Sequence, residues 1–119
     1  MTDTRLQRGV AAFNAGDFFG AHEIWEDLWV ETVGPEKFLL QGLVQIAAGY
    51  AKVETGVHAG AIKLLTRGSA LLRQYGATAF GLTLAPFVAA VEQDLERLRT
   101  MAPDAVSVDG VHAPSLQVT

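Results

Sequence analysis

The sequence predicts an all-α protein, a single domain of about five antiparallel helices with a short extended C-terminal tail. Apolar residues recur every three or four positions along five segments, as on the buried face of a helix. Glycine or proline separates most neighbouring segments. Half of the 119 residues are hydrophobic and 18% are charged, which indicates a well-filled core.

The first two helices are expected within residues 3–16 and 17–32. Asp17 can accept hydrogen bonds from the amides of the first turn of the second helix, and Gly16 can end the helix before it. In the second helix, an apolar face is predicted to carry Phe18, Ala21, Trp25, Leu28 and Trp29.

The third helix is expected from Pro35 to about Thr55. It is apolar almost all round, so it should lie at the centre of the fold with partners on several sides. A polar stripe formed by Gln41, Gln45 and Lys52 interrupts this pattern. Amides in such a helix need hydrogen-bond partners.

The fourth helix is expected from about His58 to Tyr75, and the fifth from a cap at Thr83 to the region of Pro103. We therefore divide the chain into a helical domain, residues 1–102, and a tail, residues 103–119. Valines alternate in the tail about Asp109-Gly110, which predicts an extended arm or a small hairpin. We expect this tail to lie outside the core and to cover a surface or a neighbouring subunit.

Composition and charge exclude several classes of function. A net charge of −4 disfavours non-specific attraction to nucleic acid or to an anionic membrane. The absence of cysteine excludes disulfides and thiolate metal sites. The longest apolar run, residues 38–51, contains two glutamines and is too short to span a bilayer. We therefore expect a cytoplasmic protein that binds neither nucleic acid nor membrane.

The polar residues that could form a functional site lie on the second and third helices. His22 and Glu26 are four residues apart and stack on one shoulder of the second helix beside Trp29, with Glu23 next to them. We expect this row to face the two glutamines of the third helix. The candidate ligand-binding residues are therefore His22, Glu23, Glu26, Trp29, Gln41 and Gln45.

Two motifs stand out in this sequence: Phe-Asn-x-Gly-x-Phe-x-x-Ala-His-Glu-x-x-Glu from Phe13 to Glu26, and Gln-Gly-Leu-x-Gln from Gln41 to Gln45. Together with a third block, they resemble the bacterial and archaeal domain-of-unknown-function 309 family. The third block is matched at Gly56, Gly60 and Ala61, with Val57 where the family usually has asparagine. The resemblance implies a compact all-helical fold and no established activity.

Three functions fit these observations. The first is a binding or interaction module with a polar pocket, or a buried polar network, between the second and third helices. The alternative is a metal-dependent hydrolase-like enzyme with His22 and Glu26 as ligands and Glu23 as base, since imidazole and carboxylate at this spacing can share a divalent ion. The third is an adaptor that engages a partner through the tail or a helix face. The sequence indicates no particular cofactor, and it leaves a small-molecule ligand and homo-oligomerisation open.

Overall fold

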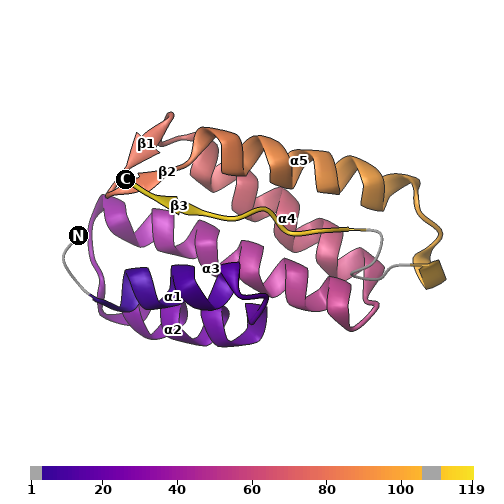
Figure 1. Ribbon diagram of the computed structural model, residues 1–119, viewed down its shortest axis with the longest axis horizontal. Coiled ribbons are helices and arrows are strands. Elements are labelled where there is room, and N and C mark those ends of the chain that lie inside the picture. The colour runs from indigo at the N-terminus through magenta and orange to yellow at the C-terminus, as the bar shows by residue number, and fades with distance from the viewer. Residues whose placement is uncertain (1–3, 106–110) are drawn as a thin grey trace.

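The computed structural model describes residues 4–105 and 111–119, which form five α-helices and a small three-stranded sheet (Figure 1). The helices are α1 (Thr4–Asn14), α2 (Phe18–Glu31), α3 (Pro35–Glu54), α4 (His58–Arg73) and α5 (Ala85–Thr100). The strands are β1 (Thr78–Ala79), β2 (Leu82–Thr83) and β3 (Gln117–Val118), and a 3₁₀ turn covers Pro103–Ala105. Each helix packs chiefly against its neighbours in the chain, which confirms the predicted helical fold and adds a sheet to it.

The joint between α1 and α2 forms as the sequence predicts. Gly16 has φ +85°, a left-handed conformation that side chains other than glycine rarely adopt. The Asp17 carboxylate then accepts a hydrogen bond of 2.9 Å from the amide of Gly20, so the predicted cap is confirmed.

Helix α3 lies at the centre of the fold, also as predicted. It packs against α2 on one side and α4 on another (Figure 1). Its closest approach to α4 depends on glycine, because a Cβ atom on Gly68 would lie 2.6 Å from Ile46 Cγ1 and 2.8 Å from the carbonyl oxygen of Gly42. The small residues of α3 and α4 therefore set the spacing of these helices.

The start of α5 differs from the prediction. The helix begins at Ala85, and Leu84 stands at the cap position without a side-chain hydrogen bond. Thr83 is instead part of β2, which pairs with β1 in a hairpin around Phe80 and Gly81, both at positive φ. Strands of two residues are too short to show a recognisable alternation, which is why the sequence pattern did not reveal them.

The C-terminal tail also differs from the prediction. Val111 and Leu116 are 2% and 1% exposed and belong to the hydrophobic core, so the expectation that the tail lies outside the core is wrong. Strand β3 pairs antiparallel with β2, and the Asn14 side chain makes two hydrogen bonds of 2.8 and 2.9 Å to the backbone of Leu116. The turn expected at Asp109-Gly110 lies outside the described residues.

None of the described helices is long and apolar enough to cross a membrane. The longest of them, α3, instead contributes nine buried residues to the protein core: Leu39, Leu40, Gly42, Leu43, Ile46, Ala47, Gly49, Tyr50 and Val53.

Candidate functional site

A shallow groove runs between α2 and α3 and contains five of the six candidate residues. It consists of two adjacent hollows, which we call the His22 hollow and the Trp29 hollow. The His22 hollow has a volume of about 360 Å³ and is lined by Phe19, His22, Ala48, Ala51, Lys52 and Thr55. The Trp29 hollow has a volume of about 220 Å³ and is lined by Glu26, Trp29, Gln41, Val44 and Gln45.

His22 and Glu26 form the boundary between the two hollows. The Nε2 atom of His22 lies 3.0 Å from Oε2 of Glu26, so the imidazole donates to the carboxylate through this nitrogen. The His22 ring also stacks on that of Phe19, with 6.2 Å between ring centroids. These contacts fix the orientation of the imidazole but leave its other nitrogen, Nδ1, buried and without a hydrogen-bond partner.

The two tryptophans of α2 have different roles. Trp25 is fully buried and its Nε1 donates a 3.1 Å hydrogen bond to the carbonyl oxygen of Leu6, so its polar group is satisfied inside the core. Trp29 is only partly buried, and the Lys37 ammonium lies 4.0 Å from its ring centroid. Its Nε1 is buried but has no hydrogen-bond partner, and the same holds for Oε1 of Gln45.

The predicted row of polar residues is only partly brought together. Glu26 lines the same hollow as Gln41 and Gln45, whereas His22 lines the adjacent one. Glu23 is exposed and lines neither hollow. Within residues 4–105 and 111–119, no hydrogen bond joins His22 or Glu26 to either glutamine.

The geometry gives no support to a metal centre on α2. In the part of the chain that the structure describes, no group of three or more histidine, cysteine, aspartate or glutamate side chains is arranged to hold a metal ion. His22 and Glu26 therefore have no third ligand of these types, and three protein ligands are usual at a catalytic zinc ion.

A buried polar pair between α3 and α5 was not predicted from the sequence. The Tyr50 hydroxyl donates a 2.5 Å hydrogen bond to Oδ2 of Asp94, which is 1% exposed, and Arg97 donates to Oδ1 at 2.8 Å. Burial raises the pKa of the Asp94 carboxyl above its usual range and also raises the pKa of the Tyr50 hydroxyl. The position of Asp94 among Val91, Leu95 and Leu98 on the inward face of α5 was the available signal in the sequence.

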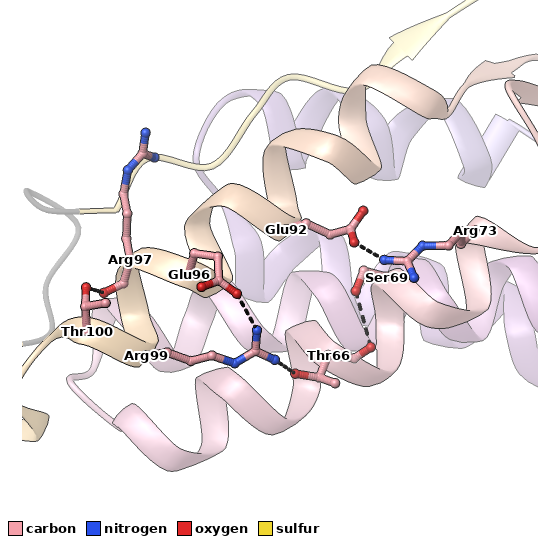
Figure 2. A network of polar contacts seen from close by, with 8 residues as sticks. All are labelled: Thr66, Ser69, Arg73, Glu92, Glu96, Arg97, Arg99 and Thr100. Atoms are coloured by element: carbon pink, nitrogen blue, oxygen red, sulfur yellow. Dashed lines mark hydrogen bonds and ion pairs between the residues drawn. The ribbon is translucent and has the colours of Figure 1, made fainter.

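Another hollow, with polar walls, lies between α4 and α5 and has a volume of about 420 Å³. Figure 2 shows that Arg73 of α4 pairs with Glu92 of α5 across it. Arg99 pairs with Glu96 at 2.9 Å and approaches the hydroxyl of Thr66 at 3.4 Å. The charged groups of this hollow already neutralise each other, so they do not require a ligand.

Fold and groove together define a small helical domain with a surface recess between its second and third helices. Residues 6–64 match the family model described as Domain of unknown function (DUF309). The chain therefore carries a domain of the DUF309 family, as its motifs predicted, and this region includes the whole α2–α3 groove. No curated protein matches the chain.

The structure explains several residues of the family motifs by packing alone. Phe13 and Phe18 are core residues whose rings pack edge-to-face with 5.1 Å between centroids, and Asn14 holds the tail. The position usually occupied by asparagine, here Val57, is the N-cap of α4 and has no side-chain hydrogen bond. An asparagine side chain at this position would cap the helix, so valine in its place removes a group whose role is structural. The motif residues without such an explanation are His22, Glu23, Glu26, Gln41 and Gln45.

Proposed function

We propose that this domain is a binding module and that the α2–α3 groove is its ligand site. One observation supports this above all. Among the described residues, the buried side-chain nitrogen and oxygen atoms that lack a hydrogen-bond partner are His22 Nδ1, Trp29 Nε1 and Gln45 Oε1. All three belong to residues that line the groove.

Unpaired buried polar atoms destabilise a folded protein. Each such atom costs about 1–3 kcal/mol relative to a satisfied one, and native proteins contain few of them. We therefore expect these three atoms of the groove to have hydrogen-bond partners when the protein performs its function. In the Trp29 hollow, Trp29 Nε1 requires an acceptor and Gln45 Oε1 requires a donor, and a polar ligand can supply both.

The apolar surface around the groove supports the same proposal. Phe19, Val30, Val33 and Phe38 are each more than half exposed. They lie on α2, on the α2–α3 joint and on the first turn of α3, the elements that form the groove. Exposed apolar groups beside oriented polar ones are typical of ligand sites, where the apolar surface supplies affinity and the polar groups supply orientation.

Nuclear magnetic resonance can test this proposal with an internal control. The chain has two tryptophans, so its indole N–H spectrum should contain one signal from the groove and one from the core. In a titration with a fragment library, fragments that bind the groove should shift the Trp29 signal. The Trp25 signal should remain in place, because its N–H is bonded to Leu6 inside the core. The Trp29→Phe variant assigns the two signals.

A pair of glutamine variants separates a ligand site from a structural feature. Gln45→Met removes the unpaired amide while keeping a side chain of similar length, so the fold should remain at least as stable. Fragment binding to this variant should weaken. Gln93→Met, on the exposed surface of α5, should change neither property. The proposal is wrong if no fragment shifts the Trp29 signal selectively, or if Gln45→Met binds the fragments as tightly as the wild type does.

A further inference from the structure

We infer that the ligand of this groove is a carboxylate with an apolar body, which lies in the His22 hollow with its anionic group on Lys52. This inference rests on the proposed function and adds the chemical class of the ligand. It follows from the shape of the hollow, the nature of its walls and the charge at its rim.

The size and walls of the His22 hollow suit a small apolar body. Its volume of about 360 Å³ falls within the range of about 300–1,000 Å³ that is usual for ligand pockets. Phe19 and His22 supply one wall as a pair of stacked rings. Ala48 and Ala51 of α3 supply another, and their short side chains leave the space open. A flat ring or a short alkyl chain would cover the Phe19 side chain, which is otherwise 64% exposed.

The charge at the rim is positive and unbalanced. Among the residues that line the hollow, Lys52 is the only one with a full charge of fixed sign, and no carboxylate is among them. Glu26 of α2 is already paired with His22. Within the part of the chain that the structure describes, no hydrogen bond or ion pair engages the Lys52 ammonium. An anionic group at this rim would meet the Lys52 ammonium, and no side chain that lines the hollow is acidic.

Matched pairs of compounds test this class of ligand directly. Phenylacetate and phenylacetamide share a body and differ in charge, as do octanoate and octanamide. Each would be titrated into the full chain while the backbone amide signals of Ala48, Ala51 and Lys52 are followed. Both carboxylates should bind about fivefold more tightly than their amides, the upper range for a partly exposed ion pair. The preference should shrink as salt is added, because salt screens exposed charges.

Two lysine variants locate the charge that is responsible. Lys52→Met should bind each acid and its amide with similar affinity, while Lys63→Met, an exposed position on α4, should keep the wild-type preference. Far-ultraviolet circular dichroism confirms that both variants are folded. Equal or tighter binding of the amides would overturn the inference, as would an unchanged preference in Lys52→Met.

The outcomes also separate this inference from the function on which it rests. If library fragments shift the Trp29 indole signal but the four compounds leave the His22 hollow unperturbed, the carboxylate class is wrong and the binding site stands. If nothing shifts the Trp29 signal and the four compounds also leave the amide signals of Ala48, Ala51 and Lys52 in place, the proposed function and the inference both fail.

Discussion

Removing the Tyr50 hydroxyl should destabilise the protein by about 2 kcal/mol. In Tyr50→Phe the ring would keep its contacts with Phe13 and Phe18, whose centroids lie 5.9 and 5.5 Å away. The change therefore removes one hydrogen bond and leaves Oδ2 of Asp94 buried without a donor. Hydrogen bonds to charged groups contribute about 1.5–3 kcal/mol, and this one is short. Arg97 would still satisfy the other carboxylate oxygen, which places the expected loss near the middle of that range.

Urea denaturation of five proteins measures this effect: wild type, Tyr50→Phe, Tyr75→Phe, Asp94→Asn and the double variant Tyr50→Phe/Asp94→Asn. Tyr75→Phe is the matched control, because its hydroxyl donates to the carbonyl oxygen of Pro35 at an exposed position and should contribute less than about 1 kcal/mol. Repeating Tyr50→Phe in the Asp94→Asn background should reduce its effect to about 1 kcal/mol, since the acceptor is then neutral. The Tyr50–Asp94 hydrogen bond does not contribute as expected if Tyr50→Phe is no more destabilising than Tyr75→Phe, or if its effect is the same in both backgrounds.

Three further changes have defined outcomes. Burial raises the pKa of the Asp94 carboxyl in the folded protein. The contribution of Asp94 to the free energy of unfolding is therefore fully present below the unfolded value of 3.8 and is lost as pH rises through the folded pKa. Urea titrations at several pH values should show the stability of wild type relative to Asp94→Asn falling as pH rises. Val57→Asn should stabilise the protein by about 0.5–2 kcal/mol in the same assay, because asparagine can cap α4. An unchanged free energy of unfolding would show that the amides of the first turn are already satisfied. Asn14→Ala should cost about 1–3 kcal/mol and speed hydrogen exchange at the Leu116 amide, whereas unchanged exchange would mean that the tail is held by other contacts.

The sequence by itself determined the five helices and most of their joints. Asp17 caps α2, Gly16 precedes it at positive φ, and α3 begins at Pro35 after Gly34. These features are local, because a cap or a turn involves residues within four positions of each other and the buried face of a helix repeats along one segment. They can therefore be recognised without any knowledge of the fold.

Part of the candidate site was predictable for the same reason. The pairing of His22 with Glu26 follows from their separation by one helical turn. Their expected proximity to the glutamines of α3 held only in part, because it depends on how α2 and α3 are rotated against each other. That rotation places Glu26 with Gln41 and Gln45, places His22 with Lys52, and leaves Glu23 exposed.

Only the tertiary structure decided the contacts between distant segments. Asn14 meets Leu116 across 102 positions of the chain, and Tyr50 meets Asp94 across 44. No local pattern specifies such pairs, because each residue is compatible with many partners until the helices have packed. The burial of the tail has the same cause. The packed helices leave an apolar site that Val111 and Leu116 fill, and the β1–β2 hairpin leaves a strand edge with which β3 pairs.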